Sequence, residues 1–221
     1  MSTKVRVWDL PTRVFHWALV ACIVASVTTA QIGGQAMAWH FRSGYTVLSL
    51  LLFRIVWGVV GGRWSRFASF VYSPATVYRY LKGQGQPGHS IGHNPLGAAS
   101  VLALLAFLLL QVASGLISDD EIATAGPFVQ FVSGAIVNDA TFYHTNVGKL
   151  ILIGLIALHI GAILFYLFRK GENLVRPMIQ GDKEVLIATE SSRDDVRSRT
   201  LAAAVFLGCV ALVTWLVSLA G

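Results

Sequence analysis

The segment His144-Thr-Asn-Val-Gly-Lys-Leu-Ile-Leu-Ile-Gly-Leu-Ile-Ala-Leu-His159 decides the fold, because it places a histidine at each end of an apolar run that continues to Phe168. As a helix it would separate the two histidines by roughly 22 Å along its axis. The histidines would lie about 60° apart around that axis, so both can face the same side. A helix that is apolar all round, apart from two histidines on one side, is typical of one wall of a membrane bundle. The segment therefore predicts partner groups at two depths on other helices.

The composition of the whole chain indicates a membrane protein. Its 221 residues are 55% hydrophobic and only 13% charged, which is too apolar for a soluble domain of this size. Runs long enough to cross a hydrocarbon core of about 30 Å are expected near Val14–Ala30, His40–Val60, Leu96–Ile117, Val147–Phe168 and Leu201–Leu219. We predict an all-α membrane protein, with a four-helix transmembrane bundle over 1–175, a cytoplasmic connector over 176–200 and a fifth transmembrane helix over 201–221.

The distribution of charge indicates a membrane topology and argues against a nucleic-acid interface. The formal net charge is +6, but most of the 17 Lys and Arg residues fall on one side of the five-span arrangement. The loops on the other side carry Asp119–Glu121 and Asp139 and almost no basic residue. This asymmetry predicts a cytoplasmic N-terminus and a C-terminus on the opposite side, with the lipid bilayer as a partner and no nucleic acid. A cleaved signal peptide ending at Ala30 is the alternative to a retained first span, and Asp9 fits it poorly.

Four histidines fall into two pairs of matching depth. His16 is expected near the cytoplasmic end of the first span, and His159 deep in the fourth span toward the same side. His40 opens the second span on the outer side, level with His144. Lone intramembrane histidines are often hydrogen-bonded core residues, but two matched pairs fit haem b, which takes one imidazole on each face of its iron. Zinc needs about four ligands, and neither layer offers a carboxylate. We therefore expect two haem b groups, with these four histidines as the iron ligands.

Two glycines and an arginine support the haem hypothesis. Gly44 and Gly148 each follow an outer histidine by four residues, which would place them on its face of the helix and leave room for a flat macrocycle. Close helix packing through small residues is the alternative. Arg54 is expected on the face of His40, deeper in the second span, where an arginine is costly unless it is paired. It either snorkels to the cytoplasmic surface or pairs with a buried anion such as a haem propionate.

The segments between the spans give less specific patterns. Ser73 and Pro74 predict the start of a short interfacial helix. His89 and His93 follow in a polar linker, at or outside the membrane surface, where we expect loop or capping roles. The apolar run 127–137 is too short to cross a membrane, so we expect a lid or an interfacial segment.

Five stretches carry a resemblance to a known family. They are Trp8-Asp-Leu-Pro-Thr-Arg-Val-Phe-His16-Trp, His40-x-x-x-Gly44-Tyr, Arg54-x-x-Trp57-Gly58, Gly92-His93-Asn-Pro-Leu-Gly97, and His144-x-x-x-Gly148 with His159. In this order, over about residues 4–175, they resemble the bacterial cytochrome b561 family, which includes the b-type cytochrome subunit of membrane-bound nickel–iron hydrogenases. The resemblance implies a core of four helices holding two bis-histidine b haems, quinone chemistry near one membrane face with a bound quinone as a further cofactor, and the bacterial inner membrane as the location.

The first expected function is that of a dihaem b-type cytochrome in a respiratory chain. It would carry electrons across the membrane between the quinone pool and a periplasmic redox partner, which is a c-type cytochrome, a hydrogenase or another dehydrogenase. The quinone site would need a proton-handling group, for which Arg13, Arg63 and His93 are the candidates. The fifth span carries no ionisable group and could contact a partner or a second copy in a homodimer. We expect an electron-transfer subunit of an oxidoreductase rather than a stand-alone enzyme.

Two other functions remain open on the sequence. A self-contained superoxide:quinone oxidoreductase would need cations near the outer haem, and Arg42 and Lys149 are the nearest. A non-redox transporter would also place histidines inside the membrane. Broken helices in paired halves would favour the transporter, and the sequence does not indicate them.

Overall fold

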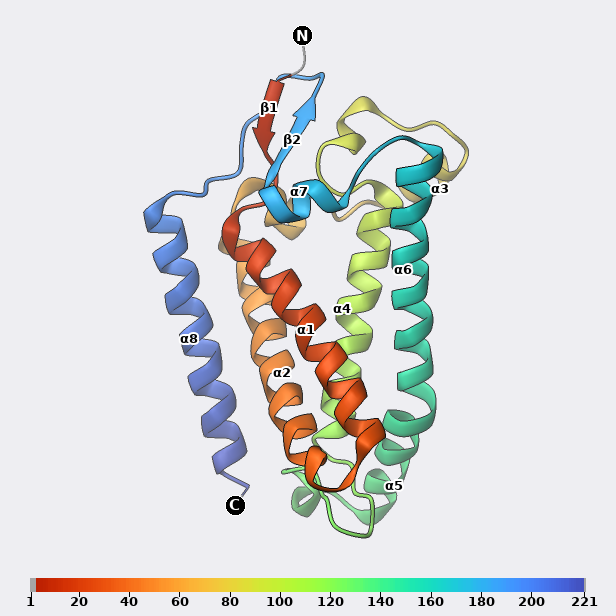
Figure 1. The fold of residues 1–221 in the computed structure, drawn as a ribbon, viewed down its shortest axis with the longest axis vertical. Helices are drawn as coiled ribbons and strands as arrows, with labels where there is room; N and C mark the ends of the chain where they lie inside the picture. The colour runs from red at the N-terminus through yellow and green to blue at the C-terminus, as the bar shows by residue number, and fades with distance from the viewer. Residues whose placement is uncertain (1–2, 221) are drawn as a thin grey trace. The chain divides into compact units, whose positions relative to one another are not determined.

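The computed structural model describes residues 3–220, and the chain is mostly helical. Within this range, five helical segments are long and apolar enough to cross a membrane (Figure 1). They are α1 (Leu10–Ile32), α2 (Met37–Val60), α4 (Pro95–Gly115), the continuous segment of α5 (Gly134–Phe142), η6 (Tyr143–Gly148) and α6 (Lys149–Arg169), and α8 (Val196–Ser218). The predicted helical membrane fold is confirmed, and each expected span corresponds to one of these segments.

Polar side chains at the caps explain where several helices begin. The Thr12 N–H donates to Asp9 Oδ1 at 2.8 Å at the start of α1, and the Gly97 N–H donates to Asn94 Oδ1 at 2.7 Å at the start of α4. The predicted start at Ser73 is confirmed, because its hydroxyl accepts from the Thr76 N–H at 3.2 Å and α3 runs from Pro74 to Leu81. The remaining short turns are η1 (Gly34–Ala36), η2 (Arg63–Ser65), η3 (Phe67–Ser69), η4 (Pro87–Ser90) and η5 (Val129–Phe131).

The apolar run 127–137 differs from its prediction. It contains η5 and the first residues of α5, and α5 continues through η6 into α6. The second half of this run therefore continues into the fourth helical segment and is not a separate lid, while its expected interfacial location stays a prediction. The sequence does not reveal this continuity, because the polar residues between Asn138 and Asn146 interrupt the apolar pattern. In the structure they do not end the helix.

The chain divides into two compact units, which we describe separately. The first unit comprises 1–16, 54–103 and 157–204, and the second comprises 17–53, 104–156 and 205–221. His16 and His159 belong to the first unit, and His40 and His144 belong to the second. Each predicted histidine pair therefore lies within one unit.

A two-stranded sheet in the first unit is absent from the all-α prediction. β1 (Thr3–Arg6) pairs antiparallel with β2 (Asp182–Val185), and α7 (Val175–Gln180) precedes the second strand (Figure 1). Val5 and Val185 are buried and pack in one hydrophobic cluster with Val7, Trp8 and Ile91. Four-residue strands are too short to leave an alternating pattern, so only their long-range pairing identifies them.

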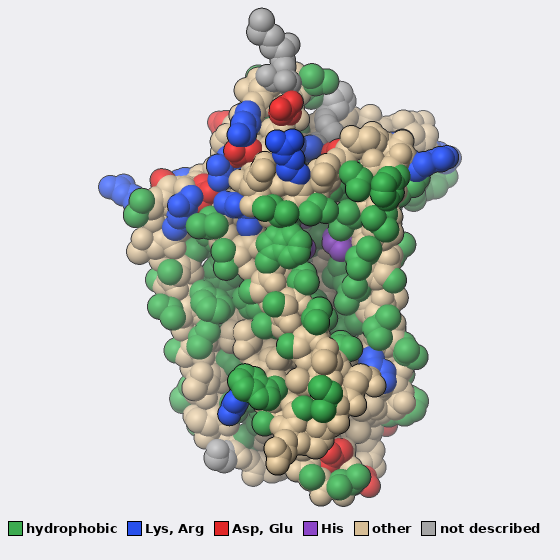
Figure 2. Space-filling view, in the orientation of Figure 1, with side chains coloured by type: hydrophobic (Ala, Val, Ile, Leu, Met, Phe, Trp, Pro, Cys, Tyr) green, Lys and Arg blue, Asp and Glu red, His purple; other side chains and the backbone are tan. Residues whose placement is uncertain are grey.

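Charged side chains gather around the two strands and the start of α8, as Figure 2 shows. Asp194 accepts from Arg6 Nη1 at 2.9 Å, Arg199 Nε at 3.0 Å and the Leu10 N–H at 3.1 Å. Burial by itself would raise the pKa of Asp194, but these hydrogen bonds and the charges of both arginines bring it below its ordinary value. The connector expected over 176–200 is therefore fastened to the N-terminal segment through an ionised carboxylate.

Replacing Asp194 with asparagine is expected to destabilise the protein at neutral pH by about 1–2 kcal/mol, because two arginines lose a charged acceptor. The folded pKa is lower than the unfolded value of about 4, so the carboxylate stabilises the fold above that pH. This contribution is lost as the pH falls through the folded pKa. Thermal unfolding of the purified protein should show a gap between wild type and Asp194→Asn at pH 7 that closes well below pH 4. The exposed Glu184→Gln is the control, and a gap of equal size at both pH values would contradict the assignment.

One side of α8 is buried in the second unit. Cys209 and Val213 are buried, and the rings of Phe206 and Phe53 have centroids 6.0 Å apart. Leu207 and Trp215 on other faces are exposed. The fifth helix therefore packs on the chain through one stripe and leaves the rest of its apolar surface outward.

Candidate functional site

The two histidines of the second unit face each other. The ring centroids of His40 on α2 and His144 in η6 lie 6.0 Å apart, and the ring planes are nearly perpendicular at 88°. His40 Nδ1 lies 2.9 Å from the Ser26 carbonyl oxygen, and His144 Nδ1 lies 2.9 Å from that of Gln111. A carbonyl oxygen can only accept, so each Nδ1 carries the proton and each Nε2 keeps a free lone pair.

The spacing of this pair fits one metal ion between two imidazoles. Bonds of about 2 Å from a metal to each Nε2 atom would place the two ring centroids about 6 Å apart. The observed separation of 6.0 Å matches that requirement. Hydrogen bonds from the other ring nitrogens to backbone carbonyls are the usual way in which proteins orient metal-binding histidines. The residues present therefore fit a haem iron, which His40 and His144 would hold.

His144 is held on several sides. Gln111 Nε2 donates to the His144 carbonyl oxygen at 2.8 Å, while the Gln111 carbonyl accepts from the ring. A Cβ at Gly115 would lie only 2.7 Å from His144 Cε1, so the glycine makes room for the ring. His144 also lies in a π-helical turn, a widened geometry that is frequent at functional sites. Sequence reasoning missed Gln111 and Gly115, because neither is close to a histidine along the chain.

The two glycines that follow the histidines differ in their surroundings. Among the described residues, no atom lies within 4 Å of a Cβ placed on Gly44, so its face is open. A Cβ on Gly148 would overlap Gln111 Oε1 and lie 2.6 Å from Tyr143 Cε1. The open face at Gly44 fits a flat macrocycle, whereas the surroundings of Gly148 correspond to close packing.

Replacing Gln111 with leucine is expected to weaken haem binding at the His40–His144 pair by about 10-fold or more, because the side chain that fixes His144 is lost. Haem loss to apomyoglobin, followed spectroscopically, measures the effect. Gln130→Leu is the matched control, because that amide donates to the Ala220 carbonyl away from the histidines. Equal haem loss from both variants would show that Gln111 has no specific role.

A buried carboxylate organises the first unit. Asp9 is fully buried and accepts from the Thr12 N–H at 2.8 Å, the Gly62 N–H at 3.1 Å, Ser65 Oγ at 2.9 Å and Trp57 Nε1 at 3.3 Å. It therefore joins the start of α1 to the end of α2. The sequence analysis assigned Asp9 no role, although its position directly before the first apolar run is that of a helix cap.

Arg54 lies beside this carboxylate. Arg54 is only 3% exposed, and its guanidinium carbon lies 4.8 Å from the centroid of the Phe67 ring. The guanidinium group also interacts electrostatically with Asp9. This burial excludes the interpretation that Arg54 snorkels to the surface. Gly58 permits the packing, because a Cβ there would clash with the Phe67 ring. Arg54 Nη1 is buried and, among the described residues, has no hydrogen-bond partner. This donor fits an additional carboxylate, such as a haem propionate.

His16 and His159 of the first unit lie close enough to interact electrostatically, and His93 interacts with His159 and Arg54. His93 lies in the loop before α4, as expected, but its ring nitrogen Nδ1 is buried and the ring packs against Trp8 and Phe70, with centroids 4.7 and 4.4 Å away. Burial, followed by the nearby positive charges, lowers the pKa of His93 to about 3.

The other linker histidine has the predicted capping role. His89 Nδ1 accepts from the Gln86 N–H at 3.2 Å in η4. Of the three candidates for a proton-handling group, Arg13 pairs with Asp194 at 3.8 Å and Arg63 pairs with Glu190. His93 is the candidate that the structure places beside the histidine site of the first unit.

Comparison with known proteins gives one family and several similar chains. The family described as prokaryotic cytochrome b561 matches residues 7–181. The "Probable Ni/Fe-hydrogenase 1 B-type cytochrome subunit" of Escherichia coli K12 is 27% identical over 139 residues, which cover 49% of this chain and 57% of the relative. The "Probable Ni/Fe-hydrogenase B-type cytochrome subunit" of Rhodobacter capsulatus is 27% identical over 224 residues, covering 82% of each chain. That of Azotobacter vinelandii is 31% identical over 135 residues, covering 49% of this chain and 55% of the relative.

The matches with Escherichia coli and Azotobacter vinelandii therefore cover little more than half of those relatives. No solved structure matches the chain.

Proposed function

Because the chain belongs to the prokaryotic cytochrome b561 family, we propose that it is a dihaem b-type cytochrome that carries electrons across the bacterial inner membrane. The electrons pass between the quinone pool and a periplasmic redox partner, for which a nickel–iron hydrogenase is the first candidate. The observation that carries the proposal is the facing pair of His40 and His144, whose ring centroids lie 6.0 Å apart with both Nδ1 atoms on backbone carbonyls.

The residues of the second unit hold one haem in this proposal. Haem b, when bound, supplies a one-electron Fe(III)/Fe(II) couple. His40 and His144 would hold the haem iron through their Nε2 atoms, and their hydrogen bonds to carbonyls would fix the ring orientation. With two imidazoles as ligands the iron would have no open position, which would favour electron transfer over binding of oxygen. Gly44 leaves the space that a macrocycle needs.

The residues of the first unit hold the second haem. His16 and His159 are the proposed ligands, and Arg54 offers its free buried Nη1 donor to a propionate. Asp9 limits the cost of burying Arg54, because a buried charge needs a nearby opposite charge. His93 closes the site beside His159 and is the proposed contact for a quinone.

The proposed partner follows from the relatives and from charge. The relatives are named as B-type cytochrome subunits of Ni/Fe hydrogenases, and the match to Rhodobacter capsulatus covers 82% of both chains. The loop Asp119–Glu121 would then lie on the periplasmic side, with the N-terminus in the cytoplasm. Its carboxylates are held by local hydrogen bonds, since Asp120 Oδ1 accepts from the N–H groups of Ile122, Ala123 and Thr124. The hydrogen bond from the Thr124 hydroxyl, followed by these three backbone hydrogen bonds, lowers the pKa of Asp120, so the loop stays negative and suits a basic partner surface.

The test uses the purified protein in liposomes that contain a quinone. Hydrogen gas should reduce the b-type absorption bands only when a purified nickel–iron hydrogenase is added on the outside, and oxidised quinone should reverse the change. A variant that lacks His144 measures the background. Failure of every hydrogenase tested, together with rapid reduction by a c-type cytochrome, would reassign the partner and retain the cytochrome.

Superoxide:quinone oxidoreduction is the second candidate. Lys149 lies close enough to His144 to interact electrostatically, which places a cation beside the pair where a small anion would arrive. Superoxide should then reduce the purified chain without any partner, and Lys149→Gln should slow that reduction. Absence of reduction by superoxide removes this candidate.

A further inference from the structure

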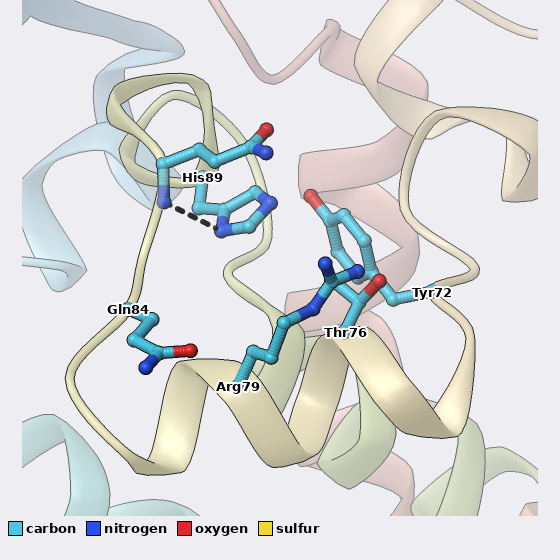
Figure 3. A pocket seen from close by; sticks show the side chains of 6 residues that line it. Tyr72, Thr76, Arg79, Gln84 and His89 are labelled. Atoms are coloured by element: carbon cyan, nitrogen blue, oxygen red, sulfur yellow. Dashed lines mark hydrogen bonds between the residues drawn. The ribbon is translucent and has the colours of Figure 1, made fainter.

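A pocket in the first unit is lined by polar and aromatic side chains and contains no acid (Figure 3). Its volume is about 290 Å³, and its lining consists of Tyr72, Thr76, Arg79, Gln84, Gln86 and His89. These residues belong to α3, η4 and the loops that connect α2 to α4. The proposed electron-transfer function uses none of them, so the pocket requires a separate explanation.

Arg79 gives the pocket its positive charge. In Figure 3 its guanidinium points from α3 into the space that the His89 ring also faces. No Asp or Glu occurs in the sequence between Gly61 and Ser118. Glu172 interacts electrostatically with Tyr80, which lies in α3 beside Arg79. This carboxylate is already paired with Lys183. Among the described side chains, Arg79 has neither a hydrogen-bond nor an ion-pair partner, so its five N–H donors remain available to an anion.

His89 and Gln86 add neutral donors. His89 Nδ1 accepts from the Gln86 N–H at 3.2 Å, so the proton of the neutral ring must lie on Nε2. The Gln86 side chain accepts from the His89 N–H through its oxygen, so its NH2 group is a further donor at the pocket. The Tyr72 hydroxyl donates to the His93 carbonyl at 3.0 Å and contributes its ring as a wall. Neutral hydrogen-bond donors arranged around an arginine can bind the oxygen atoms of an anion.

The pocket lies where a membrane protein meets lipid head groups. It is formed by the short segment between two membrane-spanning helices, and α3 and the loop before it expose apolar side chains. Val71, Tyr78 and Leu81 are 56%, 57% and 62% exposed. Short helices with exposed apolar and basic residues lie in the interfacial layer of a bilayer.

We propose that this pocket binds a phosphate group, with Arg79 as the charged contact and His89 and Gln86 as neutral donors. The phosphate comes either from the head group of an anionic phospholipid or from free inorganic phosphate. Arginine binds phosphate oxygens with two parallel hydrogen bonds, which a lysine cannot reproduce.

Native mass spectrometry of the purified full-length protein tests this proposal. Delipidated protein is titrated with phosphatidylglycerol, with phosphatidylcholine and with inorganic phosphate in separate series. Wild type should retain one phosphatidylglycerol or one phosphate, and Arg79→Ala should bind it about tenfold more weakly. Arg79→Lys should recover only part of the affinity. Lys82→Ala is the matched control, because it removes the same charge from the C-cap of α3 without lining the pocket.

The outcomes separate the two sources. Saturable binding of phosphatidylglycerol that inorganic phosphate does not displace identifies a lipid head group, while binding of the ion alone identifies free phosphate. Equal losses in Arg79→Ala and Lys82→Ala would overturn the proposal, because a diffuse positive surface would then explain the binding. Absence of any bound phosphate compound in wild type would also overturn it. Unchanged haem content in Arg79→Ala shows that the variant is folded and that the proposed cytochrome function does not depend on this site.

Discussion

Replacing His144 with alanine is expected to reduce the haem content from two b haems per chain to one. In the proposed function this histidine supplies one of the two protein ligands to the iron, together with His40, whose ring centroid lies 6.0 Å away. His40→Ala should lose the same haem, since one imidazole alone does not complete the pair. His16→Ala and His159→Ala should each lose the other haem. A pyridine haemochrome assay gives the stoichiometry, and a redox titration shows which of the two components has disappeared.

His89→Ala is the control for these four variants, because His89 caps η4 and should not affect either haem. His93→Ala is more informative. It lies beside His159 but is not a proposed ligand, so both haems should remain while the potential of one shifts. Wild-type protein with one haem, or His40→Ala and His144→Ala variants that lose different haems, would contradict the pairing. Protein without haem would leave a histidine-containing transporter as the better explanation.

Replacing Asp9 with alanine is expected to destabilise the protein by about 3–5 kcal/mol, which can prevent accumulation of the folded chain. The change leaves the N–H groups of Thr12 and Gly62, the Ser65 hydroxyl and Trp57 Nε1 without their acceptor. It also removes the negative charge that accompanies the buried Arg54. Thermal unfolding in detergent, followed by circular dichroism, measures the loss.

Asp195→Ala is the matched comparison for Asp9→Ala. Asp195 also caps a membrane-spanning helix, because its Oδ1 accepts from the Ser198 N–H at 2.7 Å at the start of α8. Unlike Asp9, Asp195 is exposed. Its loss should cost only about 1 kcal/mol, the usual value of a cap. The double variant Asp9→Ala, Arg54→Met should be more stable than Asp9→Ala alone, since it removes the uncompensated charge. Equal effects of Asp9→Ala and Asp195→Ala would show that Asp9 acts only as a cap.

Several features of the site could be predicted only in part. The placement of His144 and His159 far apart on one helical segment followed from their spacing, because an α-helix rises about 1.5 Å per residue. The surroundings of Gly148 could not be predicted from the spacing. They depend on a π-helical turn and on packing against Gln111, which is distant in the sequence. His93 was placed in a loop from its local sequence. Trp8 and Phe70, which hold its ring, come from segments that no periodic pattern connects to it.

The sequence by itself determined that this chain is a helical membrane protein with five apolar segments and paired histidines. These properties depend on hydrophobicity and on the period of the helix, both of which are local and additive along the chain. Only the tertiary structure decided that Arg54 lies buried beside Asp9, that Asp194 joins the connector to the N-terminus, and that an unpaired Arg79 lines a pocket. Such contacts join residues that are distant in sequence, and their energies depend on distance and burial, which no local pattern encodes.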